Sequence, residues 1–261
     1  MFFFCVFDRI YILFFWLFLL FNKNRIFLCV FLLSITAFVM GDYLSLPLEI
    51  FFTSRLHRRI EKTLISRKKA KEFYRLMGDI DTLFQEAGIT YWVDGGTLLG
   101  SVRNKGFVPT DDDLDICVFK VDEKNLKSIA QKLKKKGWKF EYWPRPNILK
   151  VVSQKDSDVW IDIFFVRSFK NKVHYFEASH RRGYANFFHY KEDLWPLKRV
   201  RFGPIYVMCP NNPLPYLKRG YGKNWESTTF VSKHKKVGQK PPLRFSVPLF
   251  WSTKLTKPAP W

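Results

Sequence analysis

The sequence YWVDGGTLLGSVR at 91–103, followed by TDDDLDICV at 110–118, decides the fold expected for this chain of 261 residues. A short apolar stretch, a glycine pair and a second apolar stretch carrying aspartates follow one another here. Glycines let the backbone approach a phosphate group, and the N–H groups and dipole of a helix start attract anions. Aspartates bind hard divalent cations. The segment therefore predicts an enzyme that holds an activated nucleotide beside a divalent metal.

The spacing of apolar residues places this segment among alternating helices and strands. It predicts helices over 68–87, 97–105 and 122–136, and strands over 91–93, 114–119, 139–143, 148–152 and 160–166. Gly88 and Gly137 are natural helix stops. Beyond Tyr190, proline and glycine predict mostly loops. This order favours an α/β or α+β fold, a mixed sheet with flanking helices.

The first part of the chain is expected to lie in a membrane. Residues 10–21 and 26–40 are apolar, and Asn22–Arg25 separate them. We favour one signal-anchor span over about 26–46, with the short basic separator in the cytoplasm and the catalytic domain across the membrane, lumenal in the Golgi or ER of a eukaryote. A hairpin of two segments would return the domain to the cytoplasm. Initiation at Met40 would leave the protein peripheral or soluble.

The expected organisation is a membrane anchor over 1–53, a catalytic domain over 54–232 and a basic, proline-rich tail over 233–261. The chain has 44 Lys and Arg against 23 Asp and Glu, a formal charge of +21, which favours phosphate, nucleic acid or anionic lipid as a partner. The basic residues are spread along the chain, so no single nucleic-acid stripe is predicted. Four cysteines form neither a disulfide framework nor a zinc site, and Cys117 is expected to be buried.

The aspartates are the candidate metal ligands. Alternation in a strand would place Asp111, Asp113 and Asp115 on one face, although an acidic turn after Pro109 explains them equally well. Asp162 lies within an apolar strand, where a carboxylate needs a metal or a basic partner. We expect Asp113, Asp115 and Asp162 to hold Mg²⁺ or Mn²⁺, and a buried ion pair of Asp162 with Lys or Arg is the alternative.

A second set of residues is expected to bind the phosphates of the nucleotide. The helix start provides backbone N–H groups, and basic residues near the end of the same helix provide charge. The set is Gly95, Gly96, Thr97, Arg103 and Lys105, with plain surface charge as the alternative for the two basic residues.

These motifs resemble the LicD/fukutin family of the nucleotidyltransferase-fold superfamily. The matching residues are Gly96–Gly100, Val102–Arg103, Gly106–Pro109, Asp111–Asp115, Val159–Phe165 and Tyr216–Gly222. Thr110 departs from the family, which usually has a bulky residue there. The resemblance implies transfer of a phospho-alcohol, such as phosphocholine, ribitol phosphate or glycerol phosphate, from a CDP-activated donor to a glycan or glycolipid. Asp111 would assist the metal or accept the proton of the acceptor hydroxyl.

Two other functions fit parts of the sequence. The basic charge is compatible with nucleotidyl transfer onto RNA, but the membrane segment and the LicD-like block argue against it. The other alternative is a membrane-tethered protein that binds a nucleotide or glycan without turnover. None of the predicted catalytic aspartates is missing, which argues against a loss of activity.

Overall fold

A mixed β-sheet organises the described part of the chain. The computed structural model describes residues 58, 60–144, 147–231, 245–249 and 252–261. The five principal strands of the sheet lie in the order β1 (Tyr91–Val93), β2 (Leu114–Phe119), β5 (Trp160–Phe169), β4 (Ile148–Ser153) and β3 (Trp138–Trp143). Strands β2 and β5 pair in parallel, and β1–β2, β5–β4 and β4–β3 pair antiparallel. The mixed α/β fold class expected from the sequence is confirmed.

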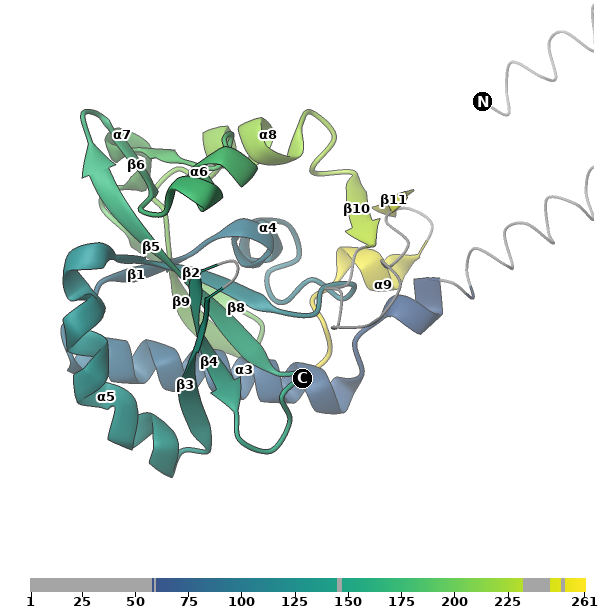
Figure 1. Cartoon of the computed structure of the whole chain (residues 1–261). Helices are drawn as coiled ribbons and strands as arrows, with labels where there is room; N and C mark the ends of the chain where they lie inside the picture. Colours follow the sequence, from purple (N-terminus) through teal and green to yellow (C-terminus); the bar gives the residue numbers. More distant parts are fainter. Residues whose placement is uncertain (1–57, 59, 145–146, 232–244, 250–251) are drawn as a thin grey trace, which may run out of the picture. The chain divides into compact units, whose positions relative to one another are not determined.

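Two short strands extend this sheet from the far end of β5. Strand β6 (Lys172–Tyr175) pairs antiparallel with β5, and β7 (His189–Tyr190) pairs antiparallel with β6. Helices α6 (Ala178–Gly183) and α7 (Lys191–Leu194) are placed around these strands (Figure 1).

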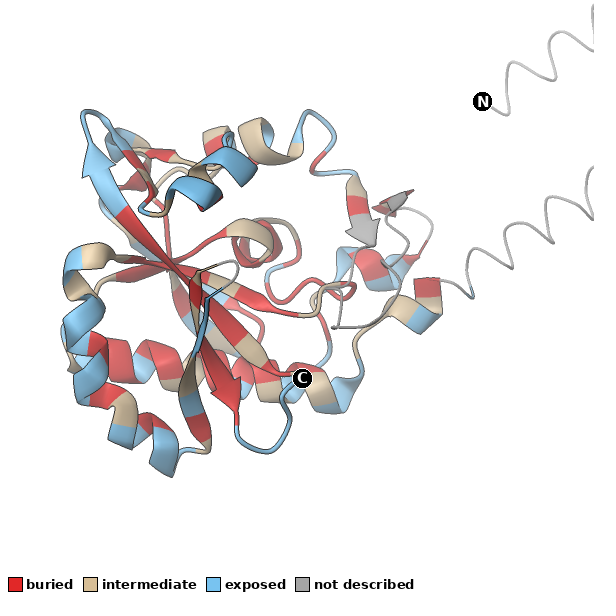
Figure 2. Cartoon of the chain, viewed as in Figure 1, coloured by how far each residue is buried: buried red, intermediate tan, exposed pale blue. Residues whose placement is uncertain are grey.

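Helices α3 (Arg67–Glu86) and α5 (Glu123–Lys135) cover one face of the sheet (Figure 1). Helix α4 (Gly95–Arg103) contributes Leu98 and Leu99 to the same large core. The 3-10 turn η1 (Lys120–Asp122) leads into α5. Both covering helices are buried on the side toward the sheet and exposed on the side away from it (Figure 2). Ser66 caps α3 by accepting a hydrogen bond from the Lys69 N–H, and Gly88 follows with a φ of +65°. These helices agree with the predicted ranges to within a residue or two.

The two faces of the sheet differ in chemistry because side chains alternate along each strand. On β5, Ile161 and Ile163 point into the large core beneath α3 and α5. Phe164 belongs to a smaller apolar cluster with Cys117, on the opposite face. Asp162 therefore lies on the face away from the large core.

The expectation of mostly loops beyond Tyr190 is wrong for the described residues. This region contains β8 (Lys198–Phe202), β9 (Ile205–Cys209), α8 (Leu214–Tyr221), β10 (Thr228–Val231), β11 (Phe245–Pro248) and α9 (Thr253–Thr256). Strands β8 and β9 form an antiparallel hairpin that turns at Gly203, whose φ is +60°. The basic residues of β8 are mostly exposed. In the sequence they form a run of charge, which does not show the alternating pattern expected of a strand.

The described part of the basic tail packs on the domain. The Ala259 N–H donates to the Phe107 carbonyl at 2.8 Å, and the Tyr74 hydroxyl donates to the Ala259 carbonyl at 3.0 Å. Ala259 is fully buried. The end of the chain therefore closes part of the core.

The membrane segment predicted within residues 1–53 lies outside the described ranges. Within those ranges, none of the helices combines the length and the apolar composition needed to span a bilayer.

Candidate active site

Three aspartates meet near the start of α4, on the face of the sheet away from the large core. Asp115 on β2 lies directly opposite Asp162 on β5, because these strands pair in parallel in that register. Asp113 immediately precedes β2. One carboxylate oxygen from each of the three lies within 4.8 Å of the others. The structure thus brings together the three residues that the sequence predicted as ligands, and the cluster could hold a cation.

The electrostatics of the cluster favour a bound cation. Burial raises the pKa of the Asp115 carboxyl well above its usual range, and the negative charges of Asp113, Asp162 and Asp111 raise it further. Asp113 and Asp162 are only 4% and 7% exposed. Oxygen ligands crowded in this way suit a hard divalent cation, which would offset their mutual repulsion.

The glycine pair brings the start of α4 against these carboxylates. A Cβ atom at Gly95 would lie 2.6 Å from Asp115 Oδ2, and one at Gly96 would collide with Asp111 Oδ2. Gly95 also has a φ of +49°, which disfavours other residues. Thr97 accepts a hydrogen bond from the Asp115 N–H at 2.7 Å. The glycines therefore permit close approach of aspartates, and phosphate binding at this helix start stays a prediction.

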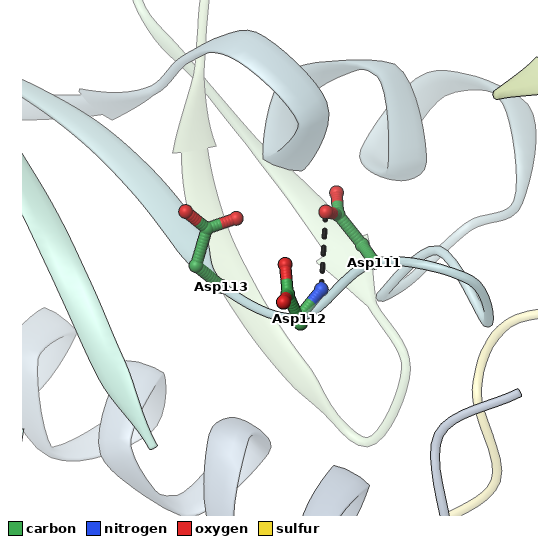
Figure 3. Close-up of side chains that lie close together, drawn as sticks. All are labelled: Asp111, Asp112 and Asp113. Carbon is green, nitrogen blue, oxygen red and sulfur yellow. Dashed lines mark hydrogen bonds between the residues drawn. The ribbon is translucent and has the colours of Figure 1, made fainter. Parts of the chain in front are cut away.

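The structure places Asp111 and Asp112 differently from the alternating strand that we expected. Strand β2 begins only at Leu114, and the preceding aspartates lie on the segment that leads into it (Figure 3). The Asp112 N–H donates to Asp111 Oδ1 at 3.1 Å. The Asp111 N–H also donates to the Val108 carbonyl at 3.0 Å, so the predicted acidic turn ends at Asp111, while Asp113 and Asp115 join the three-carboxylate cluster.

The buried ion pair that was the alternative for Asp162 is present, and the role of this residue as a metal ligand stays a prediction. Its Oδ1 atom lies 2.6 Å from the Nζ atom of Lys150, and both side chains are largely buried. Lys150 lies directly opposite Asp162 on the antiparallel neighbour β4. Asp162 is therefore a member of the acidic cluster and of a buried ion pair.

A small cavity of about 140 Å³ opens beside the cluster. Its acidic wall is formed by Asp113, Asp115 and Asp162, and its helix wall by Gly95 and Gly96. Aromatic side chains complete the lining, namely Phe164, Tyr175, Tyr184, Phe187 and Tyr221. Charges and apolar rings thus share one pocket, which is typical of ligand sites.

A buried network in the wall of the cavity was not predicted from the sequence. Asp94 is 1% exposed and accepts a hydrogen bond from the Tyr175 hydroxyl at 2.6 Å. His189 Nε2 lies 3.4 Å from Asp94 Oδ1, and its ring stacks on Tyr216. Burial alone would raise the pKa of Asp94, but His189 and the tyrosine hydroxyls lower it overall. The only signal in the sequence was the position of Asp94 as a helix cap.

Arg103 and Lys105 do not line this cavity. The Arg103 guanidinium donates to the carbonyls of Trp225 and Thr228 at 3.0 and 2.7 Å, so it links α4 to the first residue of β10 and to the segment before it. Burial lowers the pKa of Arg103 to about 10. Lys105 lines a separate cavity of about 410 Å³ together with Lys198 and Arg201. If Arg103 or Lys105 contacts a phosphate group, as predicted, it does so outside the acidic cavity.

The comparison with known families agrees with this geometry. Residues 88–212 match the family model described as LicD/FKTN/FKRP, nucleotidyltransferase domain. The chain carries a LicD/fukutin-family domain. The match includes β1, α4, β2 and β5, so it contains the acidic cluster. The resemblance to the LicD/fukutin family that the motifs predicted is confirmed for residues 88–212.

The alignments with known relatives cover part of this chain. An uncharacterised protein of Rickettsia prowazekii is 37% identical over 173 residues, which cover 66% of this chain and 62% of the relative. The ribitol-5-phosphate transferase FKTN of Mus musculus is 26% identical over 163 residues, covering 62% of this chain and 34% of the relative. The lipopolysaccharide cholinephosphotransferase LicD of Haemophilus influenzae is 36% identical over 55 residues, 21% of each chain.

The chain therefore spans a third to two thirds of the length of the first relatives that it matches. Among solved structures, the lincosamide antibiotic adenylyltransferase LnuA with bound lincomycin is similar with a TM-score of 0.35 and 18% identity. That match covers 56% of this chain and 81% of the other.

Proposed function

We propose that this protein transfers a phospho-alcohol group from a CDP-activated donor to a glycan or glycolipid acceptor, with Mg²⁺ or Mn²⁺ as cofactor. The observation that carries the proposal is the cluster of Asp113, Asp115 and Asp162 beside a cavity, inside a LicD/fukutin-family domain. The ribitol-5-phosphate transferases and the cholinephosphotransferase among the relatives support this class of reaction.

In this proposal the three carboxylates hold the cation, and Asp115 is fixed by the Thr97 hydroxyl. The bound cation would neutralise the donor diphosphate and stabilise the leaving nucleotide. Asp111 lies against Gly96 at the edge of the cluster and is the proposed acceptor of the proton from the attacking hydroxyl.

The aromatic wall would bind the rest of the donor. Tyr184, Phe187 and Tyr221 line the cavity, and rings of this kind pack on a base or on the carbon chain of an alcohol. Burial and the nearby aspartates raise the pKa of Tyr221 well above its usual range, so its hydroxyl stays protonated and can donate a hydrogen bond to a phosphate oxygen.

The test is release of CMP by the purified full-length chain. CDP-choline, CDP-ribitol and CDP-glycerol would be offered with Mg²⁺ or Mn²⁺ and a glycan mixture. We expect metal-dependent release from one donor, abolished by Asp113→Asn and by Asp162→Asn. The matched control is Asp156→Asn, because Asp156 is exposed in the turn before β5 and lies outside the cluster. Binding of a cytidine nucleotide without release from any donor would instead identify a binding protein.

Membrane attachment is part of the proposal. It rests on the apolar residues 10–21 and 26–40. Resistance of the protein to extraction by alkaline carbonate would support an integral span, and complete extraction would contradict it. Protease protection of the domain in sealed vesicles would identify the lumenal side.

A further inference from the structure

A buried lysine lies in line with the acidic cluster. In the registers of β2, β5 and β4, Asp115 lies opposite Asp162, and Asp162 lies opposite Lys150. Residues directly opposite each other on neighbouring strands share a face of the sheet. The Lys150 ammonium is 2.6 Å from Asp162, and the residue is 5% exposed. A lysine buried to this extent requires fixed partners.

Two indole rings hold the ammonium in place. Lys150 Nζ lies 4.3 Å from the centroid of the Trp143 ring and 4.7 Å from that of Trp160. Trp160 precedes Asp162 by two residues, so both side chains emerge from the same face of β5. The rings attract the cation through their faces and restrict its movement. Lys150 is therefore held against the cluster and cannot extend into solvent as most lysines do.

The remaining charge near Lys150 has its own partner. Glu141 lies opposite Lys150 on β3, but its carboxylate pairs with Lys139 at 3.3 Å and accepts a hydrogen bond from the Trp143 indole at 2.9 Å. Glu141 is thus largely balanced by Lys139. The ion pair of Lys150 is with Asp162, a member of the aspartate cluster.

We propose that Lys150 is a positioning residue that stands in for a second metal ion, so that the cluster of Asp113, Asp115 and Asp162 takes one divalent cation. The inference rests on the proposed metal-dependent function. Three carboxylates and one ammonium carry a net charge of −2, which one divalent cation neutralises. Two oxygens bound to one Mg²⁺ lie at most about 4.2 Å apart, twice the Mg²⁺–oxygen bond length, so ligand oxygens within 4.8 Å of one another need only a small shift to share a single ion.

Counting bound Mn²⁺ tests this inference without measuring turnover. Free Mn²⁺ would be followed by electron paramagnetic resonance during titration of the full-length chain. We expect one tightly bound ion in the wild type, two magnetically coupled ions in Lys150→Met, and one in Lys150→Arg, which keeps the charge. The matched control Lys132→Met removes an exposed lysine of α5 that pairs with Glu86, and it should bind one ion.

Every outcome decides the proposal. Two ions in the wild type would overturn the proposal. The second ion would then bind at the group of Asp111, Asp112 and Asp113 (Figure 3). One ion in Lys150→Met, or none, would also overturn it and would leave the proposed transfer reaction intact. Absence of Mn²⁺ binding by the wild type would overturn both proposals. If Lys150→Met does not fold, the wild-type count decides: one ion supports the proposal and two ions refute it.

Discussion

The start of α4 leaves no room for a methyl group at Gly95, and this makes Gly95→Ala a sharp test of the site. The added Cβ would lie 2.6 Å from Asp115 Oδ2, whereas real Cβ atoms essentially never approach a heavy atom closer than 3.0 Å. The Asp115 carboxylate must therefore shift within the cluster that it forms with Asp113 and Asp162. The φ of +49° adds backbone strain of about 1–2 kcal/mol for a residue with a side chain.

Gly88→Ala separates the two effects. Gly88 has a comparable φ of +65°, but an added Cβ would meet nothing within 4 Å. Both variants should lose about 1–2 kcal/mol in the free energy of unfolding, since both place alanine in the left-handed region. Only Gly95→Ala displaces a proposed metal ligand. Misplacement of a catalytic group by about 1 Å lowers rates roughly 100-fold, which is the loss of CMP release expected for this variant.

The assay combines urea unfolding, Mn²⁺ titration and CMP release for the wild type and both variants. We expect Gly95→Ala to bind Mn²⁺ more weakly than Gly88→Ala at similar stability. If the two variants bound Mn²⁺ and released CMP equally well, the close packing of α4 on Asp115 would have no role in the site, and the reasoning would be refuted.

Three further results are expected. The folded-state pKa of Asp115 is raised, so the metal-free protein should lose stability as pH rises from about 4, the ordinary value for aspartate, toward that raised pKa; melting temperatures should show this slope, and Asp115→Asn or saturating Mn²⁺ should reduce it. Arg103→Lys should lower the free energy of unfolding by about 1–3 kcal/mol by losing bonds to backbone carbonyls; weaker nucleotide binding at unchanged stability would instead support a phosphate contact. Asp81→Asn should cost about 1–3 kcal/mol in urea unfolding, because Asp81 accepts a hydrogen bond from Tyr91 at 2.6 Å and pairs with Arg199 at 2.8 Å; an unchanged midpoint would contradict this.

Local sequence patterns were sufficient to predict those helices and strands that bury one face against the core. The apolar spacing of 68–87 and the alternation of 114–119 predicted α3 and β2, because each pattern reports burial of one face. The same reasoning failed for β8. Its arginines are mostly exposed side chains of a hairpin strand, and exposed charge is compatible with a strand or a loop until a pairing partner is known.

The sequence by itself indicated the acidic residues of the cluster, the glycine pair and the family resemblance, since these depend on residue identity at short spacing. Tertiary structure alone decided the partners of those residues. Lys150 meets Asp162 only because β4 and β5 pair in one register, and a shift of one residue would turn Lys150 to the opposite face. His189 reaches Asp94 from a strand almost a hundred residues away in the chain. Register and long-range packing are set by the whole core, so no local pattern contains them.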